Sequence, residues 1–344
     1  KMKFPLANVA LLVFLVVLLV AGYVGFTNGR VAGVWLLWLH GIAAFGLMVL
    51  LFWKASIVLD AYRRKKTWTR ARVVFAIMAG LLLLTLVLGL LWTFVGPIYV
   101  AGFSLVSLHI YVAVLVLMLV VWHFWRMRFV LRLPETTGRR LFVGTAVSTL
   151  TGLFLWRTFE WSKNEWQLPG AIRRFTGSYE RGSFTGLFPS VSWIADRPKP
   201  VDVATWQLRI GGVVERPFTF SYEKLIALAT DEMVAVLDCT GGWYTTQQWH
   251  GLRLEKLLEM VGILDNAESV TIQSITGYRR RFSIAEASGF LLAVGVAERP
   301  LSHGHGFPLR LVAPDKRGVE WVKWVTEVRV NATSKIWQSP LPLQ

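Results

Sequence analysis

The chain has 344 residues, of which 54% are hydrophobic, and a formal net charge of +16. This length allows about two domains. A large positive charge often indicates a nucleic-acid partner. Here, however, most basic residues of the first half flank long apolar runs, where positive charge sets membrane orientation instead. The composition therefore predicts a membrane protein in contact with lipid and argues against nucleic-acid binding.

Four apolar segments in the first part of the chain are long enough to cross a bilayer as helices. They cover approximately residues 4–26, 33–59, 73–95 and 103–125. A fifth apolar segment, residues 141–156, is shorter and borderline. The pattern predicts an all-α transmembrane bundle over residues 1–132 and a fifth, anchoring helix within residues 133–158.

The charges of the connecting segments predict the orientation. Most basic residues of this part lie in two connections: Arg63, Arg64, Lys65, Lys66, Arg70 and Arg72 in the second, and Arg126, Arg128, Arg132, Arg139 and Arg140 in the fourth. The positive-inside rule makes both connections cytoplasmic. We therefore expect residues 159–344 on the periplasmic or extracellular side of a bacterial inner membrane.

Histidines inside the predicted spans indicate haem ligands. His40 lies about seven residues into the second segment, and His109 about six into the fourth. Both segments begin on the outer side, so the two imidazoles share a depth on the order of 10 Å. Imidazole is a common axial ligand of haem iron, and ionisable residues within a membrane are usually functional. We expect a haem between His40 and His109; the alternative is a pair of packing histidines.

A second, inner haem is left open. The segments resemble the four-helix cytochrome b subunits of respiratory enzymes, which typically carry two histidines on each of two helices. His123 follows His109 by fourteen residues, but Lys54 stands fourteen residues after His40. The resemblance implies haem b that exchanges electrons with quinone, and His123 with Lys54 as candidate ligands of the inner haem. The alternative is that Lys54 snorkels to the headgroups.

Residues 137–143, Thr-Gly-Arg-Arg-Leu-Phe-Val, resemble a twin-arginine export signal at the start of the fifth segment. Such a signal would make this segment an uncleaved anchor that exports a folded domain. The alternative is ordinary positive-inside anchoring.

The remainder of the chain alternates strand-like runs with short helix-like segments, which is typical of an α+β domain. Its central stretch, residues 236–252, contains Cys239, the only cysteine of the chain. An apolar run leads this cysteine into a turn at Gly241 and Gly242. A thiol on such a turn suits a soft metal. A buried structural cysteine is the alternative.

Residues 236–252 resemble the molybdenum-binding segment of the sulfite oxidase family, in which a cysteine thiolate ligates molybdenum held by molybdopterin. The similarity continues through residues 291–293, 300–314 and 318–324. Within the family it is closest to the periplasmic methionine-sulfoxide reductases, because the chain ends at Gln344. No room then remains for the immunoglobulin-like dimerisation domain of true sulfite oxidases. The resemblance implies a Mo-molybdopterin cofactor with Cys239 as the metal ligand.

The resemblance also implies residues that surround this cofactor. Arg310 and Lys323 supply positive charge for its phosphate. The other candidate contacts are Tyr179, Glu180, Ser274, His305, Trp321 and Val322. His305 departs from the family, which often has asparagine at this position. Tyr244 and His250 are candidate catalytic residues that would line a substrate funnel.

The implied reaction is oxygen-atom transfer with a small oxo compound, either reduction of a sulfoxide or oxidation of sulfite. Sulfite oxidation calls for cations near the metal, and no arginine stands among the three residues before Cys239. Arg253 and residues 279–281 are the remaining candidate cations. The competing hypothesis is a non-catalytic electron-transfer or assembly subunit of a larger respiratory complex. In either case a homo-oligomer or further redox subunits are candidate partners.

Overall fold

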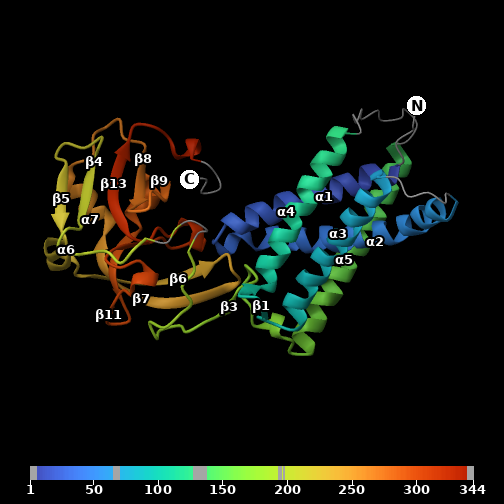
Figure 1. Cartoon of the computed structure of the whole chain (residues 1–344), viewed down its shortest axis with the longest axis horizontal. Helices are drawn as coiled ribbons and strands as arrows, with labels where there is room; N and C mark the ends of the chain where they lie inside the picture. The colour runs from blue at the N-terminus through green and yellow to red at the C-terminus, as the bar shows by residue number, and fades with distance from the viewer. Residues whose placement is uncertain (1–5, 65–69, 127–137, 193–195, 197, 339–344) are drawn as a thin grey trace. The chain divides into compact units, whose positions relative to one another are not determined.

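The computed structural model describes residues 6–64, 70–126, 138–192, 196 and 198–338 (Figure 1). The chain divides into two compact units. The helical unit comprises residues 1–26 and 31–179, and the soluble unit comprises residues 27–30 and 180–344. Residues 159–179, which we expected in the soluble domain, belong to the helical unit in this division.

The helical unit is built from long helices, as the apolar segments predict. They are α1 (Leu6–Thr27), α2 (Val34–Arg64), α3 (Arg70–Phe94), α4 (Leu105–Arg126) and α5 (Gly138–Glu165). A short hairpin of β1 (Tyr99–Val100) and β2 (Phe103–Ser104) joins α3 to α4. Four described helices are long and apolar enough to cross a membrane, with spans Val9–Thr27, Val31–Phe52, Ala76–Phe94 and Leu105–His123. The predicted transmembrane helices are thereby confirmed in number and position.

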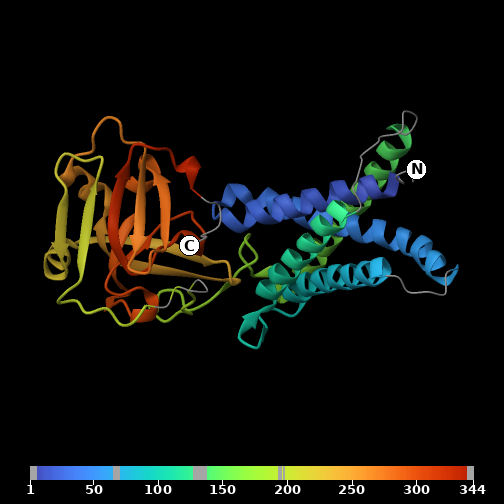
Figure 2. The same ribbon diagram turned by 45° about the horizontal axis from the view of Figure 1, so that its top comes forward.

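Glycines allow these helices to approach closely. α1 packs along α2 (Figure 2), where a Cβ on Gly46 would lie 2.5 Å from the ring of Phe14. α2 also packs on α5, where a Cβ on Gly152 would lie 2.7 Å from the carbonyl oxygen of Ile42. Any larger residue at these two positions would push the helices apart.

The fifth helix is longer than the apolar segment that predicts it. α5 has 28 residues, because it continues beyond Trp156 through polar residues to Glu165. It is not among the four described helices that are apolar enough to count as candidate spans. Thr137 and the side chains of Arg139 and Arg140 lie outside the described residues, so the export signal stays a prediction.

The soluble unit contains two mainly antiparallel sheets with short helices between strands, which confirms the predicted α+β class. One sheet has the order β11-β10-β7-β3, with β12 beside β10 and β6 beside β7. Its strands are β3 (Tyr179–Glu180), β6 (Asp231–Cys239), β7 (Trp243–Arg253), β10 (Leu291–Val296), β11 (Arg299–Pro300) and β12 (Arg310–Val312). The other has the order β5-β4-β13-β8-β9, in which β13 and β4 run parallel. Its strands are β4 (Gln207–Gly212), β5 (Phe218–Ser221), β8 (Ser269–Ser274), β9 (Arg279–Ser283) and β13 (Val325–Asn331).

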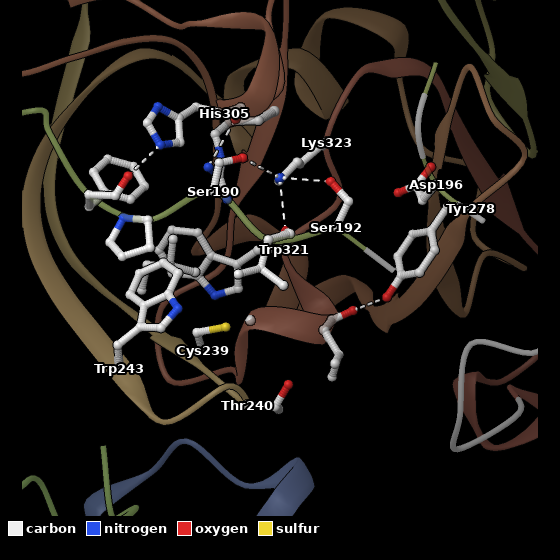
Figure 3. A pocket seen from close by; sticks show the side chains of 17 residues that line it. Ser190, Ser192, Asp196, Cys239, Thr240, Trp243, Tyr278, His305, Trp321 and Lys323 are labelled. Atoms are coloured by element: carbon white, nitrogen blue, oxygen red, sulfur yellow. Dashed lines mark hydrogen bonds between the residues drawn. The ribbon is translucent and has the colours of Figure 1, made fainter. Parts of the chain in front are cut away.

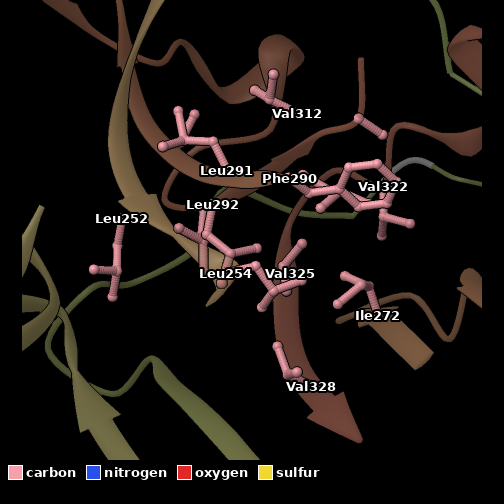
Figure 4. Close-up of a cluster of buried hydrophobic side chains, with 14 of the residues drawn as sticks. Leu252, Leu254, Ile272, Phe290, Leu291, Leu292, Val312, Val322, Val325 and Val328 are labelled. Atoms are coloured by element: carbon pink, nitrogen blue, oxygen red, sulfur yellow. The ribbon is translucent and has the colours of Figure 1, made fainter. Parts of the chain in front are cut away.

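The core of this unit is formed by side chains from both sheets and from α7 (Leu254–Val261) (Figure 4). Leu254 of α7, Leu292 of β10, and Ile272 and Val325 of the second sheet are fully buried. Truncation of such a leucine to alanine typically costs about 2–5 kcal/mol. Two further helices, α6 (Tyr222–Leu228) and α8 (Ile284–Ser288), complete the unit. This rigid frame holds the ends of β6 and β7, where Cys239 lies.

Candidate active site

Cys239 is the last residue of β6 and stands at a tight hairpin. It pairs with Trp243, the first residue of β7, across a turn of three residues. Gly242 in this turn has φ +89°, a left-handed conformation that favours glycine. The N–H of Gly241 lies 3.3 Å from the Cys239 sulfur and donates to it. The hairpin therefore presents the thiol at a fixed position with a donor aimed at it.

A buried ion pair lies next to the thiol. Arg317 Nη1 lies 3.3 Å from Asp238 Oδ1, and Arg317 Nη2 donates to the carbonyl oxygen of Cys239 over 3.2 Å. Burial raises the pKa of the Cys239 thiol, and the Gly241 N–H and the Arg317 charge offset this only in part. The thiol thus stays protonated unless a cation binds the sulfur, since a metal-coordinating thiol loses its proton.

The sulfur of Cys239 points into a cavity of about 100 Å³, beside Trp243 (Figure 3). A Cβ on Gly318 would lie 3.2 Å from the Cys239 Cα, so glycine there lets residues 317–318 lie against the thiol's backbone. The polar and charged side chains of the wall are Ser190, Ser192, Asp196, Cys239, Thr240, Tyr278, His305, Arg310 and Lys323. Of the predicted site residues, Cys239, His305, Arg310, Trp321 and Lys323 therefore come together.

Lys323 is a half-buried cation whose hydrogen-bond partners are neutral. Its Nζ donates to the carbonyl oxygens of Gly304 at 2.6 Å and Val191 at 2.9 Å. The hydroxyls of Ser190 and Ser192 each lie 3.3 Å away. Burial and then the charge of Arg310 lower the pKa of Lys323 to about 7. An anion in the cavity would favour the protonated amine.

Arg310 is a second cation in the same wall and is fully buried. Its side chain is 1% exposed and lies over the rings of Trp249 and Trp321. Nη1 donates to the carbonyl oxygen of His305 over 3.0 Å, whereas the buried Nε has no hydrogen-bond partner among the described residues. Burial lowers the pKa of Arg310 to about 9. Two desolvated cations and an unused donor suit an anionic cofactor better than a neutral one.

His305 supports the cavity wall through both ring nitrogens. Nε2 lies 2.9 Å from the carbonyl oxygen of Phe188, and Nδ1 lies 3.0 Å from the Ser302 hydroxyl. Burial lowers the pKa of His305, which favours the neutral ring. A carbonyl oxygen only accepts, so the proton belongs on Nε2. The ring also stacks on Phe188, with centroids 4.1 Å apart, and thereby fixes the segment that carries Ser190.

The other predicted site residues lie elsewhere. Alternation along β7 places Trp243, Thr245 and Trp249 on its buried face. Tyr244 and His250 point to the opposite face and are not among the residues that line the cavity. Their catalytic role stays a prediction.

The remaining cofactor candidates also lie outside the cavity wall. Val322 is fully buried in the core, and Ser274 contacts the cavity only indirectly, through Thr276 and Asp196. Glu180 is exposed and accepts the Ser183 N–H, and Tyr179 is buried in the helical unit.

Sequence reasoning missed Arg317 and the unused donor of Trp243. The Trp243 Nε1 is buried without a hydrogen-bond partner among the described residues, and the ring lines the cavity. Lys316 and Arg317 look like surface charges in a turn. The usable signal was Asp238, a carboxylate on an apolar strand next to Cys239, because a buried carboxylate requires a cation.

Glu286 anchors the segment that carries Arg317. It lies 2.6 Å from Lys316 Nζ and 2.5 Å from Lys335 Nζ. Burial alone would raise the pKa of Glu286, but the hydrogen bonds from both lysines outweigh it and lower the pKa to about 2. The resulting stability is present above pH 4.5, the ordinary pKa, and is lost as the pH falls towards 2.

Glu286→Gln should therefore lower the free energy of unfolding at pH 7, by about 1 kcal/mol after allowance for solvent screening. Glutamine retains the helix cap to Ser283, so the change isolates the charge. Denaturant unfolding of the purified chain at several pH values measures the difference, which should shrink below pH 4.5. The exposed Glu259→Gln is the matched control. An equal loss at every pH would contradict the ion-pair account.

A second candidate site lies within the helical unit. The rings of His40 on α2 and His109 on α4 face each other, with centroids 6.1 Å apart and planes at 71°. Two imidazoles that share one metal at about 2 Å per bond place their centroids roughly 6 Å apart. The observed centroid spacing is close to this value.

The hydrogen bonds of both rings favour metal ligation. His40 Nδ1 lies 2.9 Å from the carbonyl oxygen of Leu18, and His109 Nδ1 lies 2.8 Å from that of Thr85. Each Nδ1 must carry the proton, because a carbonyl only accepts, and each Nε2 is then a bare ligand atom. Gly22 and Gly89 stand against the two rings, where a Cβ would come within 3.0 Å and 3.3 Å.

The inner pair is described only in part. His123 is a half-buried residue of α4, while Lys54 lies on α2 with its side chain outside the described residues. Their role as haem ligands stays a prediction.

Comparison with known proteins finds matches for the soluble unit. Residues 195–337 match the family described as oxidoreductase molybdopterin binding domain. A protein-methionine-sulfoxide reductase catalytic subunit of Xanthomonas axonopodis pv. citri is 29% identical over 38% of this chain and 46% of its own length. An uncharacterized oxidoreductase of Bacillus subtilis is 29% identical over 42% of this chain and 74% of its own length. The match thus spans about half the length of the first of these relatives.

Among solved structures, the sulfane dehydrogenase SoxCD from Paracoccus pantotrophus is 23% identical, with a TM-score of 0.38. The match covers 39% of this chain and 40% of that chain. The cavity holds the thiol of Cys239 and the cations Arg310 and Lys323. Residues 195–337 of this chain, which include all three of these residues, match the oxidoreductase molybdopterin binding domain family.

Proposed function

We propose that the chain is a membrane-bound molybdopterin oxidoreductase that reduces a small sulfoxide-type compound and receives electrons from the quinone pool through haem b. The observation that carries this proposal is the placement of Cys239, Lys323 and Arg310 around one cavity. The neighbouring imidazoles of His40 and His109 in the same chain support the part of the proposal that concerns electron transfer through haem.

The residues of the cavity fit a molybdopterin cofactor. Cys239 would ligate molybdenum through its thiolate, with the Gly241 N–H and Arg317 stabilising the negative charge. Arg310 and Lys323 would bind the anionic part of the cofactor. The unpartnered Trp243 Nε1 would donate a hydrogen bond to it. When bound, this cofactor supplies oxygen-atom transfer, and the protein supplies position and charge.

The charges of the cavity favour a neutral oxo substrate over sulfite. Arg310 and Lys323 both lie in the wall, and both would be engaged by the cofactor. Arg253 and Arg280, which we considered as cations for sulfite, do not line the cavity. Arg280 instead forms a buried ion pair with Glu320. The similarity to a protein-methionine-sulfoxide reductase subunit also supports sulfoxide reduction.

The soluble unit would face the periplasm or cell exterior. The basic second and fourth connections support this orientation through the positive-inside rule. A reporter enzyme that works only outside the cytoplasm should be active when fused after Gln344. Activity from a cytoplasm-specific reporter alone would reverse the orientation.

The function is tested on the purified full-length chain. Molybdenum and haem are measured first, and the haem is then reduced with a quinol. Addition of methionine sulfoxide should reoxidise the haem, because the sulfoxide takes two electrons and two protons and leaves as sulfide and water. Reduction of oxidised haem by sulfite would assign the opposite direction. Loaded protein that responds to neither compound would favour the non-catalytic subunit, which acts only with further redox partners.

A further inference from the structure

Arg173 is a half-buried cation at the same end of the helical unit as the histidine pair. Its guanidinium Nη1 donates to the hydroxyl of Thr93 over 2.6 Å, and its side chain is 20% exposed. Thr93 lies one residue before the end of α3 and is 2% exposed. A charged group in this position needs an anionic partner.

A continuous set of contacts joins this cation to the haem ligand. The ring of His109 lies against Gly89 of α3. Thr93 stands four residues later, about 6 Å along the helix and on the same face. Its hydroxyl donates to the carbonyl oxygen of Gly89 over 3.4 Å and accepts from Arg173. Arg173 therefore lies about one helical turn beyond His109, towards the polar end of α3.

The position of Arg173 is fixed by its own segment. A Cβ on Gly170 would lie 2.5 Å from Thr93 Cγ2 and 2.8 Å from the Thr93 carbonyl oxygen, so only glycine permits this approach. Phe159 packs against Phe45 of α2 and Phe94 of α3, with ring centroids 5.5 and 5.2 Å apart. The end of α5 is thus attached to α2, which carries His40, and to α3, whose Gly89 lies against the ring of His109.

Among the residues that the structure describes, the charge of Arg173 is only loosely compensated. Its Nη2 lies 3.8 Å from Glu160 Oε1, beyond hydrogen-bond distance. Glu160 is held more closely by Lys163, at 2.6 Å. An arginine has five N–H donors in a planar fork that matches a carboxylate. Arg173 therefore has capacity for one more carboxylate on its partly exposed side.

We propose that Arg173 binds a propionate of the haem held by His40 and His109, and so orients the cofactor edge towards the polar end of α3. This inference rests on the proposed haem site. Propionate carboxylates are costly in the apolar interior of a membrane and should face a cation near its surface. The geometry supplies one such cation in contact with the helix face that carries Gly89 and Thr93.

The first test is the haem midpoint potential of the purified full-length chain. Arg173→Gln should keep the bis-imidazole spectrum but shift the reduction equilibrium about tenfold towards the oxidised form, or about 59 mV for one electron. The sign follows because a nearby positive charge stabilises the reduced haem. Arg173→Lys should stay near the wild-type potential. Arg157→Gln, an exposed residue of α5, is the matched control and should change nothing.

The second test removes the carboxylates instead of the cation. Apoprotein is reconstituted with haem or with haem dimethyl ester, whose propionates are uncharged. The difference between wild type and Arg173→Gln should vanish with the ester. If Arg173→Gln does not accumulate, the rate of haem release from Arg173→Lys is measured instead. This variant should release native haem several-fold faster than wild type. It should release the dimethyl ester at the wild-type rate.

An unchanged potential in Arg173→Gln, together with unchanged haem retention in Arg173→Lys, would overturn this inference while the haem site stands. A difference that persists undiminished with the ester would also overturn it, because Arg173 would then act without the propionates. Wild-type protein without a bis-imidazole haem would remove the proposed haem site itself, and this inference with it.

Discussion

Replacement of Cys239 by serine should abolish turnover and the molybdenum–thiolate spectroscopic signal while leaving the haem spectrum intact. Serine is nearly isosteric but is a hard and poorly acidic ligand, whereas the thiolate is soft. Loss of the outer partners of a metal ligand already costs about 10- to 100-fold. Loss of the ligand itself should therefore cost more than a hundredfold. The haem spectrum should persist because the histidine pair lies in the other compact unit.

The measurement has a built-in control. Cys239 is the only cysteine, so the variant has no thiol and any residual thiol reaction marks a contaminant. Molybdenum content, pterin content and sulfoxide turnover are then compared on the same preparation. Pterin retained without the thiolate signal would show that Arg310 and Lys323 hold the cofactor on their own. A variant with full turnover would remove Cys239 from the reaction.

Replacement of either His40 or His109 by alanine should remove the haem between them. Each imidazole supplies one of two axial bonds, and no other described histidine lies beside the pair to replace it. The bis-imidazole absorption should be lost, and haem-dependent quinol oxidation should fall to background. Sulfoxide reduction with an artificial donor that reduces the soluble unit directly should continue, because the cavity is unchanged.

The haem-to-protein ratio then resolves the inner site. A wild-type ratio near two, which falls to near one in Lys54→Ala or His123→Ala, would establish a second haem. A ratio of one that neither variant changes would leave a single haem at His40 and His109. If His40→Ala and His109→Ala both keep an unaltered bis-imidazole spectrum, the outer site is misassigned.

The sequence predicted the structure correctly wherever a strong local pattern coincided with a chemical requirement. Apolar length predicted the four spans, and the glycine turn predicted that Cys239 would end a strand. Each of these depends on near neighbours in the sequence, and so needs no knowledge of the tertiary fold.

The positions that the sequence could not place relative to the cavity are those that only tertiary packing decides. Tyr244 and His250 stand close to Cys239 in sequence, but strand alternation directs them to the opposite face from Trp243. Tyr179 looked like a pterin contact, yet it packs on Trp92 and donates its hydroxyl to the Trp92 carbonyl oxygen. Arg317 looked exposed because its partner, Asp238, lies 79 residues earlier. No local pattern reports a pairing over such a separation.

The partners of the two facing imidazoles have a consequence for mutational tolerance. Both acceptors are main-chain carbonyls, of Leu18 on α1 and Thr85 on α3. Substitutions at these two positions leave the carbonyl in place, so a deep mutational scan should find them permissive to apolar residues of similar size. A single-residue insertion upstream in either helix should behave differently. It turns the downstream carbonyls by about 100° around the axis and withdraws the acceptor, although every ligand residue is still present. Haem binding would thus depend on the length of α1 and α3, which contribute no ligand, more than on the side chains at Leu18 and Thr85.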